Sequence, residues 1–184
     1  MKSKCILDEF EELSLKKNIT KEELMIILKK YASTISVHDL MIASAHLRKE
    51  AEYVQANYRE KFLEIYNRSF IMSTKDILEN EDYNHKSIID KKAFEKSFPR
   101  FKRTFEKEKM TIHNDDKFPL IYVVNTAYVT FILEEPVHLV GSEYPGGLKI
   151  EEINGEYFCP VKDSQKDNIN AVCHLCVARQ TPDI

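Results

Sequence analysis

Tryptophan is absent from this 184-residue chain, and glycine is scarce, with only four residues. Rossmann and P-loop folds place glycines where the backbone must approach a phosphate, so this scarcity disfavours both. The motifs G-x-S-x-G and H-E-x-x-H are also missing, and no E-x-x-H falls on a predicted helix. The sequence therefore carries no signature of an α/β-hydrolase, a zincin or a di-iron bundle.

The sequence also lacks a long hydrophobic run and a strong charge of either sign. Its longest apolar stretch, residues 118–133, is shorter than the roughly 18 residues of a membrane span and contains Asn125. The N-terminus has no apolar core of signal-peptide length. The formal net charge of −3 gives no electrostatic reason to expect nucleic acid or an anionic membrane as a partner. We therefore expect a cytoplasmic protein whose partner, if it has one, is another protein.

Apolar residues recur at helical spacing through most of the first 133 residues. This periodicity predicts helices over residues 3–16, 20–32, 36–70, 90–109 and 118–133. The third of these segments forms either one long helix or two helices with a break near residues 49–53. Thr20 and Glu23 match a capping box, which is expected to start the second helix.

Two parts of this region are harder to assign. Ser73 or Thr74 is expected to cap a short helix that ends at Leu78, before a loop over residues 80–87. Residues 118–133 are rich in β-branched side chains, which favour a strand. The run is longer than a typical strand and does not alternate, so we favour a helix there.

A stripe of phenylalanine dominates the segment 90–109, with spacings of four, three and four between Phe94, Phe98, Phe101 and Phe105. These spacings place the four rings on one face of a helix. Pro99 should kink this helix or mark a second N-terminus. The opposite face is basic and carries Lys91, Lys92, Lys96, Arg100, Lys102 and Arg103. Because the aromatic and basic residues segregate, a core stripe with a solvated face is favoured over RNA binding.

Residues 134–184 differ in composition, since they hold all four glycines and three of the four cysteines. Asn154-Gly155 is a strong hairpin signal, and it predicts paired strands over residues 148–153 and 156–159. The fold class that follows is mainly α, a domain of five to seven helices with a small C-terminal β-hairpin and loop. We expect a helical body over residues 1–133 and a C-terminal element over residues 134–184, packed together as one domain.

Three cysteines of the C-terminal element are candidate metal ligands. Cys173 and Cys176 form C-x-x-C, a spacing at which two thiolates can bind one tetrahedral ion, and Cys159 ends a predicted strand. In a reducing cytoplasm, such a cluster favours metal or redox chemistry over disulfides. A structural zinc needs a fourth ligand, for which the candidates are His138, His174, Cys5 and His113. We prefer His138, because it lies in the same irregular segment.

Other interpretations of the cysteines stay open. Three thiolates with an open fourth position would also suit a catalytic zinc or an iron–sulfur cluster. A C-x-x-C can be a dithiol redox pair, although such a pair usually opens a helix in a βαβ-type fold. The three residues could also simply pack in a small core as reduced cysteines.

The C-terminal part of the chain resembles a known family through the stretches EPVHLVGSEYPGG, YFCPVKDSQKDN and AVCHLCVARQ. These are similar to the uncharacterised archaeal proteins, mainly from methanogens, that are grouped as domain of unknown function 2115. The resemblance implies no activity and no catalytic residue. It implies an anaerobic cytoplasm, where zinc thiolates and oxygen-sensitive clusters both persist. It also implies a motif stretch that includes Glu135, His138, Gly141, Pro145, Gly146, Gly147, Cys159, Cys173 and Cys176.

Two hypotheses about function follow. The first is a non-enzymatic accessory or binding protein in which Cys159, Cys173, Cys176 and His138 hold a structural zinc that orders a partner-facing surface. The second is a metalloenzyme or redox protein with an open zinc or iron–sulfur site. The sequence does not choose between an enzyme and a binding protein, and it indicates no substrate.

Overall fold

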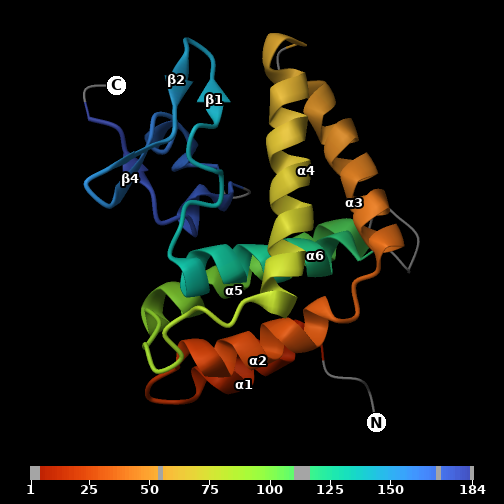
Figure 1. Ribbon diagram of the computed structural model, residues 1–184, viewed down its shortest axis with the longest axis vertical. Helices are drawn as coiled ribbons and strands as arrows, with labels where there is room; N and C mark the ends of the chain where they lie inside the picture. Colours follow the sequence, from red (N-terminus) through yellow and green to blue (C-terminus); the bar gives the residue numbers. More distant parts are fainter. Residues whose placement is uncertain (1–4, 54–55, 110–116, 169–170, 183–184) are drawn as a thin grey trace.

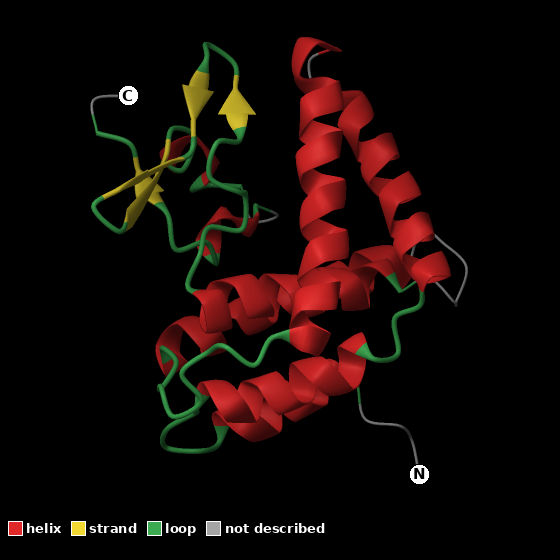
Figure 2. Cartoon of the chain, in the orientation of Figure 1, coloured by secondary structure: helices red, strands yellow, loops and turns green. Residues whose placement is uncertain are grey.

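The structure is a computed structural model that describes residues 5–53, 56–109, 117–168 and 171–182. In these ranges six α-helices precede five short strands, which confirms a mainly α fold with a small C-terminal β element (Figure 1). Figure 2 shows the strands gathered in one corner of the molecule, beside the helices. The helices are α1 (Ile6–Ser14), α2 (Lys21–Ala32), α3 (Val37–Glu50), α4 (Ala56–Glu79), α5 (Lys91–Lys109) and α6 (Phe118–Ala127).

Capping boxes start α2 and α3. The backbone N–H of Glu23 donates to Thr20 Oγ1 at 3.2 Å, and the Thr20 N–H donates to the Glu23 carboxylate at 2.8 Å, which confirms the predicted box. Ser36 and Asp39 form the same pair at the start of α3. Burial acts to raise the pKa of Asp39, but hydrogen bonds from Ser36 and Lys117 outweigh it and lower this pKa to about 2.

The long third segment is two helices, as one of the predicted alternatives requires. A short 3₁₀ turn at Ala51–Tyr53 follows α3, and α4 begins at Ala56. The expected cap at Ser73 or Thr74 is wrong, because α4 runs unbroken to Glu79. Both side chains are buried inside the helix bundle, where the Thr74 hydroxyl donates to Asn125 Oδ1 of α6 at 3.3 Å. A polar side chain can therefore lie inside this helix without starting a new one.

The phenylalanine stripe of α5 lies in the core, as its spacing predicts. Phe94 and Phe101 are fully buried, and Phe98 and Phe105 pack against the same cluster. The Phe94 ring meets that of Phe10 from α1 at 5.2 Å between centroids, in an edge-to-face arrangement. The helix continues through Pro99, so no second helix begins there.

Helix α6 forms the centre of the bundle, which confirms the helical prediction for residues 118–133. It packs against α2, α3, α4 and α5, and nearly all of its side chains are buried. A π-helical turn, Tyr128–Leu133, continues α6. Lys21 stabilises the end of this turn by donating to the Ile132 carbonyl at 2.7 Å. None of the described helices is long and apolar enough to cross a membrane.

The C-terminal strands form two small sheets. Strand β3 (Glu151–Ile153) pairs antiparallel with β4 (Glu156–Cys159), and β5 (Arg179–Gln180) pairs parallel with β4. Asn154 and Gly155 both have positive φ, 55° and 80°, as a two-residue type I′ turn requires. The predicted hairpin is thus confirmed, but its first strand is divided. Residues 148–149 form β2 (Leu148–Lys149), which pairs instead with β1 (Glu143–Tyr144).

Candidate functional site

The three C-terminal cysteines reach one region of the structure by different routes. Cys159 ends β4, where the parallel pairing sets it opposite Gln180 of β5. Cys173 lies in a 3₁₀ turn, Val172–His174, and Cys176 follows that turn. Cys159 and Cys173 are buried, Cys176 is half-buried, and no disulfide joins any of them. The pairing of β4 with β5 therefore returns the chain after Cys176 to the side of Cys159.

The three thiols also interact electrostatically with one another. Burial raises the pKa of Cys159 and of Cys173. Negative charge on Cys176 would raise both pKa values further, and charge on Cys159 would raise that of Cys173. The pKa of the Tyr144 phenol is raised by burial first. Negative charge on each of the three thiols, Cys159, Cys173 and Cys176, raises it further. All three thiols therefore lie near enough to the half-buried Tyr144 to affect the pKa of its phenol.

Two further side chains hold this cluster together. The Lys162 ammonium donates to the carbonyl oxygens of Cys173 at 2.6 Å and Cys176 at 2.8 Å, so it fixes the turn that carries the C-x-x-C. Tyr144 packs against the buried cluster that contains Cys159, and its hydroxyl partly opposes the burial that raises the pKa of Cys159. Cys159 and Cys176 pack with the same buried residues, Ile150 and Ala178 among them. No sequence motif marks Lys162 or Tyr144 as part of a site, and both emerge only from the folded chain.

The predicted ligands are not drawn together into a preformed coordination group. Among the described residues, no three His, Cys, Asp or Glu side chains form a group that could hold a metal ion as they stand. An ion bound by these cysteines would therefore have to draw their side chains inward. The metal site stays a prediction.

The candidates for a fourth ligand differ in position. His138 is half-buried, and its ring lies edge-on to Tyr144 with 6.5 Å between centroids. Burial lowers the pKa of His138 to about 4, so its imidazole is neutral at pH 7. His174 is exposed and its Nε2 lies 3.1 Å from the Asn168 carbonyl. Cys5 precedes α1, which packs on α2 and α5 rather than on the C-terminal element. His113 lies outside the described residues.

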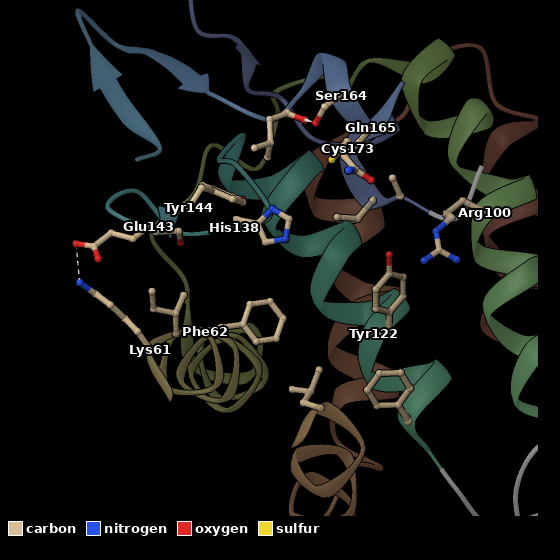
Figure 3. Close-up of a pocket in the computed structure, with 17 residues that line it drawn as sticks. Lys61, Phe62, Arg100, Tyr122, His138, Glu143, Tyr144, Ser164, Gln165 and Cys173 are labelled. Carbon is tan, nitrogen blue, oxygen red and sulfur yellow. Dashed lines mark hydrogen bonds and ion pairs between the residues drawn. The ribbon is translucent and has the colours of Figure 1, made fainter. Parts of the chain in front are cut away.

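A pocket of about 410 Å³ lies between the helical body and the C-terminal element. Figure 3 shows His138 and Tyr144 on one side of it and Tyr122 and Arg100 on the other. Cys173 also lines the pocket, so the cysteine cluster reaches its wall. The remaining lining residues are Leu47, Lys61, Phe62, Ile65, Phe118, Ser142, Glu143, Val161, Ser164, Gln165, Ala171 and Val172.

Three charged side chains line this pocket, and the sequence singled out none of them as a site residue. Glu143 binds Lys61 at 2.7 Å and Lys149, outside the pocket, at 3.1 Å, and these two contacts lower the pKa of Glu143. Arg100 was assigned to the solvated basic face of α5, which is wrong for this residue. It is half-buried, and its guanidinium lies 5.2 Å from the ring centre of Tyr122.

The sequence matches the family described as "Uncharacterized protein conserved in archaea (DUF2115)" over residues 20–181. The chain belongs to the DUF2115 family. The match includes Cys159, Cys173, Cys176 and His138, and it extends well into the helical body. The resemblance noted from the C-terminal stretches is therefore confirmed, and it covers most of the chain.

Relatives of this DUF2115 chain come from methanogens. A UPF0305 protein of Methanothermobacter thermautotrophicus is 32% identical over 166 residues, which cover 90% of this chain and 99% of the relative. A UPF0305 protein of Methanocaldococcus jannaschii is 25% identical over 163 residues, which cover 88% of this chain and 97% of the relative. No solved structure matches the chain. These comparisons place the chain in a family, but the names of the family and of these relatives state no reaction.

Proposed function

We propose that this protein is a non-enzymatic accessory or binding protein of the cytoplasm, whose C-terminal element is held in shape by a structural zinc ion. The thiolates of Cys159, Cys173 and Cys176 supply three ligands. His138 supplies the fourth, since its ring lies edge-on to Tyr144 and it lines the same pocket as Cys173. The ion orders a segment rich in turns, and the ordered surface serves to bind a partner protein.

The observation that supports this proposal is that all three thiols of the C-terminal element lie near enough to Tyr144 to affect the pKa of its phenol. Cys159 and Cys176 pack in one buried cluster, and Lys162 ties the backbone of Cys173 to that of Cys176. The core of that cluster is small, with Ile150, Cys159 and Ala178 as its buried members. A core of this size gives limited hydrophobic stabilisation, so a bound ion would add much of the order that the element needs.

The first experiment is a metal analysis of full-length protein purified without oxygen. We expect about one zinc per chain and no visible absorbance, because Zn²⁺ has a filled d shell. Replacing Cys173 and Cys176 together with serine should remove the zinc. The matched control is Cys5→Ser, which changes an exposed cysteine beside α1 and should leave the zinc content unchanged. Equal metal content in the double variant and the wild type would contradict the proposal.

A second candidate function follows from the position of Cys173. Because Cys173 lines the pocket, an ion bound there could keep one coordination position open to a small molecule, as catalytic zinc sites and some iron–sulfur clusters do. The same metal analysis separates the two candidates. A brown protein that contains iron and sulfide, or a zinc whose fourth ligand exchanges with added azide, would favour a metalloenzyme or redox protein over the structural site.

A further inference from the structure

The pocket between the helical body and the C-terminal element has the form of a small-molecule site. Its volume of about 410 Å³ falls within the range of roughly 300–1,000 Å³ that ligand pockets occupy. Its walls are largely apolar, and a few polar groups face one another across it, which is the usual composition of such sites. The apolar lining residues come from both sides: Leu47, Phe62, Ile65, Phe118, Val161, Ala171 and Val172.

The charges on the pocket wall do not cancel. Among the described lining residues, Glu143 is the one acidic side chain, and it is already bound to Lys61 and Lys149. Arg100 forms no ion pair with a carboxylate of the described residues. The wall therefore presents one cation whose charge the described chain does not neutralise.

The hydrogen bonding of Arg100 is also incomplete. Its Nη1 donates to Thr104 Oγ1 at 3.1 Å. Its Nε is buried and has no hydrogen-bond partner among the described residues. A buried donor without an acceptor costs free energy, so such a group calls for an acceptor from outside the chain. The guanidinium carbon lies 5.2 Å from the ring centre of Tyr122, and this contact restricts the movement of the guanidinium. A guanidinium held in place suits oxyanions, which it binds through paired N–H donors.

We infer that this pocket binds a small organic anion, an oxyanion such as a carboxylate or phosphate carried on an apolar body, with Arg100 as the residue that recognises the oxyanion. The apolar walls bury the body of the ligand, and the ion pair of Lys61 with Glu143 borders the pocket. This inference goes beyond the proposed zinc site and does not depend on it, because neither Arg100 nor the apolar walls are proposed metal ligands.

The test is a titration of full-length, ¹⁵N-labelled protein with hexanoate, followed through backbone amide chemical shifts. We expect saturable changes at Tyr122, Val172 and other residues that line the pocket. Hexanol carries the same chain without a charge, and it should bind at least about tenfold more weakly, the ratio expected when a charged hydrogen bond is lost. Inorganic phosphate that displaces hexanoate would show that the oxyanion alone is recognised, whichever molecule carries it.

A matched pair of variants locates the charge. Arg100→Met should weaken hexanoate binding at least about tenfold. Arg103→Met removes the same charge from an exposed position on the same helix, outside the pocket, and should leave binding unchanged. The inference is overturned if hexanol binds as well as hexanoate, or if the shift changes spread over the surface. The wild-type titration decides both points even if Arg100→Met does not fold.

Discussion

Replacing Lys162 with methionine tests how the C-x-x-C turn is held in the absence of any metal. The substitution keeps most of the length and the apolar character of the side chain's stem but removes its ammonium group. Two hydrogen bonds are lost, one to the Cys173 carbonyl at 2.6 Å and one to the Cys176 carbonyl at 2.8 Å. Lys162 is half-buried, so water can satisfy part of what these carbonyls lose.

The expected loss of stability follows from these two contacts. A hydrogen bond that involves a charged group contributes about 1.5–3 kcal/mol, and partial replacement by water reduces the sum of two such bonds to roughly 2 kcal/mol. For a chain of 184 residues, a change of about 1 kcal/mol shifts the Tm by about 2–4 °C. We therefore expect Lys162→Met to lower the Tm by about 4–8 °C.

The assay is thermal unfolding followed by circular dichroism, in the presence of a chelator. Lys166→Met is the control, because Lys166 lies in the same loop, is exposed and loses the same charge. Its Tm should stay within about 1 °C of the wild type, since exposed substitutions usually change stability by less than ~0.5 kcal/mol. Equal Tm values for the two variants would refute the view that Lys162 holds the cysteine turn.

The helices and the hairpin give further predictions. Asp39→Asn should cost about 1–2 kcal/mol at pH 7. The pKa of Asp39 is lowered to about 2, so the stabilisation from its ionised carboxylate is complete above pH ~4 and is lost as the pH falls towards 2. A difference between the urea midpoints of the wild type and the variant that does not shrink by pH ~3 would contradict this. Gly155→Ala should cost about 1–2 kcal/mol from its positive φ alone, because no atom lies within 4 Å of the added Cβ; an unchanged urea midpoint would refute the strain. Lys21→Met should destabilise by about 2–3 kcal/mol, since the Ile132 carbonyl loses its 2.7 Å donor, and a Tm equal to the wild type would count against that role.

Much of the helical body could be predicted from local patterns. Phe94 and Phe101 lie in the core because a stripe with spacings of three and four residues covers one face of any helix. Thr20 starts α2 because its hydroxyl and the Glu23 carboxylate satisfy donors within the same turn. Such features depend on residues three or four positions apart, so the sequence alone contains the information that determines them.

The features that failed or were missed depend on residues far apart in the sequence. Thr74 does not cap a new helix, because its hydroxyl donates to Asn125 on α6 instead. Arg100 leaves the solvated face of α5 because the pocket wall and the Tyr122 ring lie beside it. The contact of Lys162 with the C-x-x-C turn arises from the folding of a loop. No periodicity or motif in the sequence predicts contacts between such distant residues, so only the three-dimensional structure shows them.

X-ray absorption at the zinc edge of full-length protein purified without oxygen tests the central claim most directly. The account predicts a four-coordinate ion with three sulfur ligands at about 2.3 Å and one nitrogen ligand at about 2.0–2.1 Å. A zinc shell of oxygen and nitrogen alone, or protein that binds no zinc when its cysteines are reduced, would contradict the claim that Cys159, Cys173 and Cys176 hold a metal.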